Sequence, residues 1–277
     1  MTSAQIEAQP LIINPPRTTQ YKQYQEYDRI YPFTTETLKD YMKDLEGKDV
    51  LAVESSDDHR LNALTLGARS VDTFDINHLT RIYSELKEEI IKHLSYQEFL
   101  DFIKNSLKYI ERVKDYLKPD IKEFWQWYYL YFMHGRNSIY QTNLFYECYP
   151  AMDYLAFNHY FSEDKYNILQ KRLQTSTSRD RYYMDISLLP KAINKKYDTI
   201  YLSSIIHYRK DLLSFQKTIL EIYSKLLKEN GNLYYGYFYA GHHGLEEMYL
   251  RSLPTSDVIK VPSANGFGQD DILVLRK

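Results

Sequence analysis

The chain has 277 residues and a formal net charge of −2 at pH 7, because 35 Lys and Arg nearly balance 37 Asp and Glu. Hydrophobic residues make up 44% and charged residues 26%, which excludes a disordered or low-complexity chain and predicts a globular protein. The near-neutral charge supplies no long-range attraction to nucleic acid or to anionic lipid, so we expect no nucleic-acid partner.

The cysteine content and the N-terminal sequence bear on the compartment. The single cysteine, Cys148, excludes an intramolecular disulfide and a Cys-rich zinc site, which favours a reducing compartment. We interpret it as a small buried hydrophobic residue rather than a catalytic thiol. Residues 1–16 lack a basic stretch followed by an apolar one, and no run of about 18 apolar residues occurs. We expect a soluble, cytoplasmic protein without a transmembrane segment.

Composition divides the chain into an arm and one folded domain. Residues 1–18 are polar, contain three prolines and lack periodicity, so we expect a flexible arm. We assign residues 19–277 to one α/β domain, with a helical insertion at about 95–175. Residues 121–161 of the insertion include fifteen aromatic residues. This density favours an aromatic-rich packing layer over the alternative, a cage for a ligand.

Hydrophobic patterns predict the first six elements. Apolar runs indicate buried strands, and apolar residues three and four positions apart indicate helices. Pro119 and Gly135 are expected to break the helical patterns of the insertion. In chain order, the sequence predicts a strand at 49–53, a helix at 61–66, a strand at 70–74, a helix from Leu79 to about His93, and helices at 98–117 and 122–133.

Beyond the insertion, strands again alternate with helices. The sequence predicts strands at 181–184 and 199–203, a helix at 212–226, a strand at 232–239, and a hairpin of 258–261 with 272–275. Asn230 and Gly231 are expected to end the helix that precedes the fifth strand. This alternation predicts a Rossmann-like α/β fold, in which helices cover both faces of a mainly parallel sheet and a terminal strand is antiparallel.

Polar residues follow the predicted strands, and ligands of open parallel sheets bind outside the carboxyl ends of the strands. Asp75 ends the second strand, 21 residues after Glu54 ends the first. This is close to the spacing at which a carboxylate accepts hydrogen bonds from ribose hydroxyls. Taken singly, each carboxylate is explained as well by a helix N-cap as by ligand binding. The occurrence of several such carboxylates at strand ends favours a ligand site.

Two phosphate-binding motifs are absent from the sequence. It contains neither G-x-G-x-x-G nor G-x-x-x-x-G-K-[ST], so no pyrophosphate loop or P-loop is visible. The sequence therefore favours a ligand without phosphates over a nucleotide. An adenosine joined to an amino acid through a sulfonium has ribose hydroxyls and a positive charge, and it suits a first loop that is rich in Ser and Asp.

Several segments resemble one known family. Residues 31–36, with the sequence YPFTTE, and residues 50–58, with the sequence VLAVESSDD, resemble the start of proteins related to S-adenosylmethionine:diacylglycerol 3-amino-3-carboxypropyltransferases. Segments 67–77, 86–99 and 197–203 are similar to later motifs of that family. The resemblance spans residues 21–277 and implies a fold of the class I methyltransferase type, with S-adenosyl-L-methionine as the co-substrate.

The resemblance also implies how the ligand is held. Ser55, Ser56 and the neighbouring backbone would line the methionine part, Asp75 would hold the ribose, and Asp185 would approach the adenine amino group. The residues expected to bind the co-substrate are Thr34, Thr35, Glu36, Glu54, Ser55, Ser56, Asp57, Asp75, Ile76, Asn77, Asp185 and Ser203.

Two positions depart from the family pattern. Asp57 stands where the family has Gly, and a non-Gly residue costs about 1–2 kcal/mol if the backbone there is left-handed. His78 stands where a proline is common after the second strand. These departures predict that substrate binding is retuned or that catalysis is lost.

The resemblance favours transfer of a 3-amino-3-carboxypropyl group to an unidentified small-molecule or lipid acceptor, with methylthioadenosine as the leaving group. Methyl transfer, which releases S-adenosylhomocysteine, is one alternative. A sensor or scaffold that binds S-adenosylmethionine without turnover is the other. The residues expected to orient or deprotonate the acceptor are Asp58, His59, His207 and Tyr208. The adjacent pair His242 and His243 lacks carboxylates at a ligand spacing, so we expect no metal.

Overall fold

The computed structural model describes residues 29–133, 135–146, 151–175, 179–208, 211–240, 256–263, 266 and 268–277. The predicted arm, Cys148, His242 and His243 lie outside the described residues. The chain divides into two compact units. We call Met1–Pro32 with Asn77–Met152 the helical unit, and Phe33–Ile76 with Asp153–Lys277 the sheet unit.

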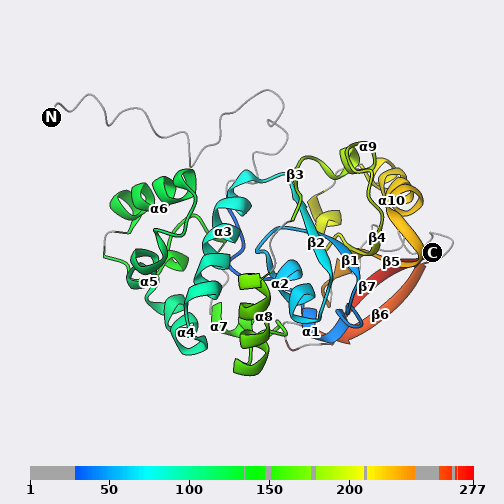
Figure 1. The fold of residues 1–277 in the computed structure, drawn as a ribbon. Helices are drawn as coiled ribbons and strands as arrows, with labels where there is room; N and C mark the ends of the chain where they lie inside the picture. Colours follow the sequence, from blue (N-terminus) through cyan, green and yellow to red (C-terminus); the bar gives the residue numbers. More distant parts are fainter. Residues whose placement is uncertain are drawn as a thin grey trace, which may run out of the picture. The chain divides into compact units, whose positions relative to one another are not determined.

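The sheet unit is built on a seven-stranded sheet in the order β3-β2-β1-β4-β5-β7-β6 (Figure 1). The strands are β1 Asp49–Val53, β2 Ser70–Asp75, β3 Arg181–Tyr183, β4 Tyr197–Tyr201, β5 Leu227–Phe238, β6 Ser256–Pro262 and β7 Gln269–Arg276. Pairing is parallel from β3 to β5, and β7 runs antiparallel to both β5 and β6. This order, with β7 reversed, is that of class I methyltransferases, so the predicted fold class is confirmed.

Residues along β1 explain its place at the centre of the sheet. All five residues of the strand are buried, as expected for a parallel strand that is covered on both faces. Leu51 and Val53 join a core cluster with Phe215 and Ile219 of α10, while the intervening residues point to the opposite face. The helices of this unit are α1 Leu38–Tyr41, α2 Asp58–Thr65, α8 Glu163–Thr175, α9 Leu189–Ala192 and α10 Leu212–Leu226, with 3₁₀ turns at Ile186–Leu188 and Ile205–Tyr208.

Aromatic packing dominates the helical unit. Its helices are α3 His78–His93, α4 Tyr96–Lys104, α5 Ser106–Val113 and α6 Pro119–Phe132, with a 3₁₀ turn at Ile139–Gln141, and α7 Ala151–Leu155 follows at its end. On α6, Phe124 stacks on Tyr128 with the ring centroids 5.6 Å apart, and Trp125 meets Tyr128 edge-on. All three rings are buried, whereas Tyr129 and Tyr131 of the same helix are exposed, so packing accounts for part of the predicted aromatic layer.

Several element boundaries differ from the sequence predictions, four of them at residues that explain the difference. Asn105 separates α4 from α5, so the helix predicted at 98–117 is two helices. Pro119 begins α6 instead of interrupting a helix, because proline fits the first helical turn. Strand β4 ends at Tyr201, and Ser203 already has a positive φ of 57°. Strand β5 begins at Leu227, directly after α10, and Asn230 lies where its register with β4 shifts.

Candidate functional site

The carboxyl ends of β1 and β2 meet at Asp75. The backbone N–H of Ser55 donates a hydrogen bond to Asp75 Oδ2 at 2.8 Å, and the N–H of Glu54 donates to the carbonyl of Phe74 at 2.8 Å. Asp75 and Ser55 are both half-buried. The predicted ribose-binding carboxylate therefore lies against the predicted first loop.

The same loop borders the switch point of the sheet. β1 pairs with β2 on one side and with β4 on the other, and the chain order reverses between β1 and β4. In open parallel sheets, ligands bind in the crevice at such a point. Asp75, the last residue of β2, and Ser203, which follows β4, lie at this carboxyl edge of the sheet.

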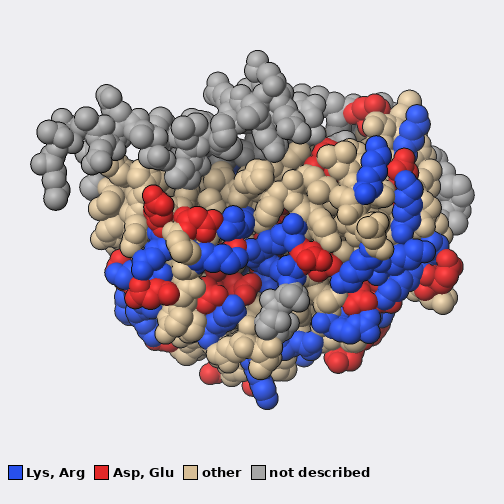
Figure 2. Space-filling model, turned by 45° about the horizontal axis from the view of Figure 1, so that its top comes forward, with Lys and Arg blue, Asp and Glu red and all other residues tan. Residues whose placement is uncertain are grey.

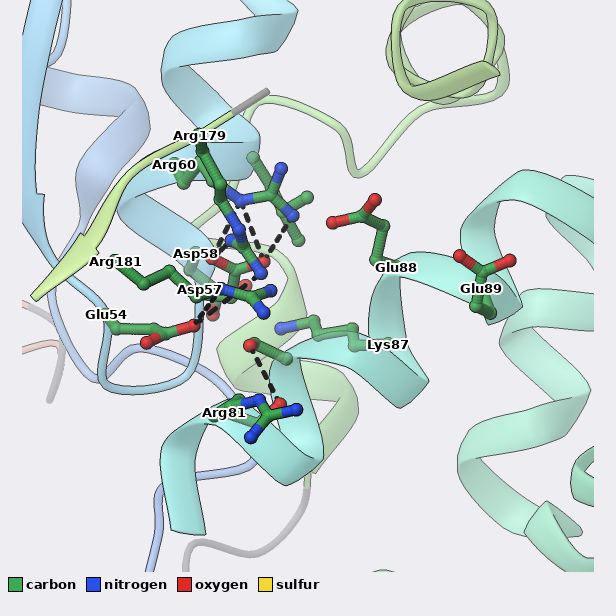
Figure 3. Close-up of polar contacts among 12 residues, drawn as sticks. Glu54, Asp57, Asp58, Arg60, Arg81, Lys87, Glu88, Glu89, Arg179 and Arg181 are labelled. Atoms are coloured by element: carbon green, nitrogen blue, oxygen red, sulfur yellow. Dashed lines mark hydrogen bonds and ion pairs between the residues drawn. The ribbon is translucent and has the colours of Figure 1, made fainter. Parts of the chain in front are cut away.

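Asp57 adopts the left-handed backbone that the sequence comparison anticipated. Its φ is 67°, and Ser55, two residues earlier, also has a positive φ of 45°. The Asp57 carboxylate is buried and accepts three hydrogen bonds from Arg60, the shortest from Nη2 at 2.6 Å. Arg179 Nη1 donates a further bond to it at 2.9 Å (Figure 3). Two guanidinium groups therefore hold this carboxylate in the turn.

Glu54, at the end of β1, is held by the strand next to β2. It is fully buried, and its Oε1 lies 3.2 Å from Arg181 Nε and 3.6 Å from Arg179 Nη2 (Figure 3). Tyr183 donates its hydroxyl to Glu54 Oε2 at 3.1 Å. Two buried carboxylates from the loop after β1, Arg60 of α2, and two arginines from β3 and its approach form one network. We call it the arginine–carboxylate cluster: Glu54, Asp57, Arg60, Arg179 and Arg181.

Asp58 is engaged by three donors. Its Oδ2 accepts the backbone N–H of Thr34 at 2.6 Å and the hydroxyl of Ser56 at 3.0 Å, and its Oδ1 accepts the hydroxyl of Tyr160 at 2.5 Å. The residue is fully buried. These contacts fasten the Thr34 segment to the start of α2, which is a positioning role.

Glu36 and His59 form a second buried group with Tyr41 and Ser203. Tyr41 donates its hydroxyl to Glu36 Oε2 at 2.6 Å, and Ser203 donates to Glu36 Oε1. His59 Nε2 lies 3.4 Å from Glu36 Oε2. Burial would raise the pKa of Glu36, but its interactions with His59, helped by the hydroxyls of Ser203 and Tyr41, lower it below the usual 4.5. Glu36 is therefore a carboxylate at neutral pH.

The remaining predicted residues are spread more widely. Thr35 bonds to the hydroxyl of Tyr239 at 2.6 Å, and His207, which is exposed, places Nε2 3.1 Å from the carbonyl of Tyr237. Asp185 accepts the N–H of Ser187 and so caps a 3₁₀ turn. Three further predicted residues are Ile76 and Tyr208, both half-buried in the sheet unit, and Asn77, which caps α3 in the helical unit.

Sequence reasoning missed the residues that hold the predicted carboxylates. Arg179 lies 122 positions after its partner Asp57, so no local pattern connects them. Arg60 carried a signal, because it follows Asp57 by three residues on a helix, where such pairs meet. Tyr41 and Tyr160 carried none beyond the general excess of tyrosine.

The described surface carries charges of both signs. Figure 2 shows basic and acidic side chains together over the lower part of the surface in view, with basic side chains prevailing on its right flank. No group of at least three His, Cys, Asp or Glu among the described residues has an arrangement that could hold a metal ion. None of the described helices combines the length and apolar character needed to cross a bilayer.

The sequence matches no protein-family model and no curated protein. Solved structures similar to it include an rRNA methylase from Streptococcus thermophilus, with 8% identity over 84% of this chain and 89% of that one and a TM-score of 0.40. The rRNA methyltransferase aviRa from Streptomyces viridochromogenes has 10% identity over 87% and 80% of the two chains and a TM-score of 0.43. The N-methyltransferase NodS from Bradyrhizobium japonicum, solved with S-adenosyl-L-homocysteine, has 15% identity over 42% and 63% and a TM-score of 0.29. All these similarities are low, and the fold assignment rests on the strand order.

Proposed function

We propose that this chain is an S-adenosylmethionine-dependent transferase that moves a methyl group. The observation that carries the proposal is the half-buried carboxylate of Asp75, held against the N–H of Ser55 at the carboxyl edge of a sheet with the class I methyltransferase strand order. A carboxylate only accepts hydrogen bonds, which suits the two donors of a ribose. The positive φ of Ser55 and Asp57 supports the same assignment, because it turns the backbone sharply beside that carboxylate.

The proposed binding residues come from the loops after β1, β2 and β4. Asp75 would accept the ribose hydroxyls, and Ser55 and Ser56 would face the amino-acid part. Asp185 would approach the adenine amino group, and the segment Thr34–Glu36 would lie over the ligand. We assign the arginine–carboxylate cluster to positioning, because Asp57 already accepts hydrogen bonds from two arginines and Glu54 is already ion-paired with Arg181.

When bound, S-adenosylmethionine supplies an electrophilic carbon beside a sulfonium, and its sulfur leaves as a neutral thioether. The protein then has to align the acceptor and to remove its proton. Transfer of the 3-amino-3-carboxypropyl group is the second candidate. It is favoured by the resemblance of segments 31–36 and 50–58 to the enzymes that carry out that reaction.

We propose a small molecule or a lipid as the acceptor. The net charge of −2 supports this over nucleic acid. Some of the structures with similar topology are described as rRNA methylases, so total RNA belongs in the acceptor panel.

Calorimetry and product analysis test the proposal together. The purified chain is titrated with S-adenosylmethionine and then incubated with it and with dioctanoylglycerol, a catechol or total RNA. We expect saturable binding and S-adenosylhomocysteine as the product. Methylthioadenosine would identify the second candidate, and binding without either thioether would indicate a sensor. An absence of binding would overturn the proposal.

A further inference from the structure

His59 has one buried ring nitrogen for which the described part of the chain supplies no hydrogen-bond partner. The side chain is only 2% exposed, and no described residue offers a hydrogen bond to Nδ1, whereas Nε2 faces Glu36 and Tyr41. Leaving a buried polar atom unsatisfied costs about 1–3 kcal/mol. The unsatisfied Nδ1 atom therefore needs an explanation, and a hydrogen bond to a group of a bound ligand would supply it.

The surrounding contacts fix which nitrogen carries the proton. Nε2 lies 3.4 Å from the Tyr41 hydroxyl and 3.4 Å from Glu36 Oε2. That hydroxyl has one proton and already donates it to Glu36 at 2.6 Å, so it cannot also donate to Nε2. Nε2 must therefore be the donor toward the Glu36 carboxylate. In neutral His59, the lone pair is then on Nδ1.

This arrangement is that of a carboxylate-oriented base. A carboxylate that holds one N–H of an imidazole fixes its tautomer and stabilises the imidazolium that forms when the other nitrogen takes up a proton. Ser203, which follows β4, also bonds to Glu36, and the His59 ring lies 6.0 Å from that of Tyr201 at the end of β4. The pair thus lies between the carboxyl ends of β1 and β4, at the switch point of the sheet.

We propose that His59 Nδ1 is the general base that deprotonates the acceptor, and that Glu36 is the positioning residue that holds His59 Nε2–H. The inference rests on the proposed transferase function and specifies its substrate class: an acceptor whose nucleophile is a hydroxyl or amine that still carries its proton. As the bond from the acceptor oxygen or nitrogen to carbon forms, the carbon–sulfur bond breaks and its electron pair stays on sulfur. The acceptor proton moves to Nδ1, and solvent later removes it.

The first test reads the tautomer and needs no substrate. Nitrogen-15 NMR of histidine-labelled protein, at a pH where the imidazole is neutral, should show the His59 proton on Nε2 and not on Nδ1. Glu36→Gln should weaken this preference, because it removes the acceptor charge. The titratable and charged groups that face His59 are Glu36, Tyr41 and Tyr201, with Asp58 and Arg60 beside it on α2. A spectrum with the proton on Nδ1 would overturn the proposal, whether or not the protein binds S-adenosylmethionine.

The second test separates chemistry from binding. His59→Gln should slow thioether formation in single-turnover reactions by about 100-fold or more, the usual scale for a general base, while S-adenosylmethionine affinity changes less than about threefold. The ascending limb of the wild-type pH–rate profile should be lost. The control His93→Gln alters another histidine beside a carboxylate, Glu89 at 3.2 Å, and should leave the rate unchanged. Wild-type turnover by His59→Gln would refute the base, whereas failure of the wild type to bind would refute the transferase function instead.

Discussion

Asp75 Oδ2 accepts the backbone N–H of Ser55 at 2.8 Å, which joins the end of β2 to the loop after β1. The contact does two things at once. It fixes the carboxylate at the carboxyl edge of the sheet, and it closes the first loop against the neighbouring strand. Any ligand that uses this carboxylate is therefore held beside Ser55.

Replacing Asp75 tests its ribose role. Asp75→Asn should weaken S-adenosylmethionine binding by about 1–3 kcal/mol, because the amide replaces an acceptor with a donor next to ribose hydroxyls. Calorimetry measures the change. The matched control is Asp198→Asn, which alters a half-buried aspartate near the start of β4, at the opposite edge of the same sheet. Equal affinities for Asp75→Asn and the wild type would remove Asp75 from the site.

Asp57→Gly has two opposing effects on stability: it relieves backbone strain, and it breaks a buried ion pair. Glycine relieves a left-handed residue by about 1–2 kcal/mol, whereas breaking a buried pair costs about 3–5 kcal/mol, so the variant should lose about 1–4 kcal/mol of unfolding free energy. Urea denaturation measures this. Asp44→Gly is the control, because Asp44 also has a positive φ, 56°, but is exposed. That variant should gain up to about 1 kcal/mol. A stabilised Asp57→Gly would show that the contacts to Arg60 and Arg179 contribute little.

The pH dependence of stability should report Asp49, at the start of β1. Hydrogen bonds from Arg69, opposed by burial and aided by Lys228 and Ser70, lower the pKa of Asp49 well below its ordinary 3.8. A carboxyl pKa that is lower in the folded state stabilises the fold above the unfolded pKa, and the contribution is lost as the pH falls. Urea unfolding should therefore separate Asp49→Asn from the wild type most at about pH 7 and progressively less below about pH 4. A constant difference across this range would contradict the assignment.

A capping box begins α4 in the helical unit. Ser95 accepts the N–H of Glu98, and the Glu98 side chain accepts the N–H of Ser95. Ser95→Ala should lower the unfolding free energy by about 1 kcal/mol, because a helix N-terminal donor loses its partner. The control Ser224→Ala, near the end of α10, should be neutral or slightly stabilising, because alanine favours helices. Denaturation curves that show equal losses for both would indicate that the cap contributes nothing specific.

Local sequence patterns were sufficient to predict the strands and helices whose apolar residues follow a regular spacing. The apolar run of β1 and the spacing along α3 predicted elements that the structure places at Asp49–Val53 and His78–His93. The predicted start of β5 was wrong, because Asn230 and Gly231 resemble the end of a helix. Instead, Asn230 takes its positive φ of 61° inside the strand, and its N–H donates to the carbonyl of Lys277.

The candidate site was predictable in its carboxylates and not in their partners. Asp75 and Glu54 were found because they follow strands. Arg179 and Arg181, which pair with Asp57 and Glu54, come from beyond the insertion. The pairing of His59 with Glu36 joins residues 23 positions apart without a periodic pattern. Only tertiary contact could show that Asp58, expected near the acceptor, is bound by Thr34, Ser56 and Tyr160.

A crystal structure with S-adenosylhomocysteine tests the central claim most directly. The account predicts the nucleoside at the carboxyl edge of the sheet, with both ribose hydroxyls within hydrogen-bond distance of the Asp75 carboxylate. A complex in which other residues hold the ribose, or saturating ligand that leaves no density beside Asp75, would contradict it.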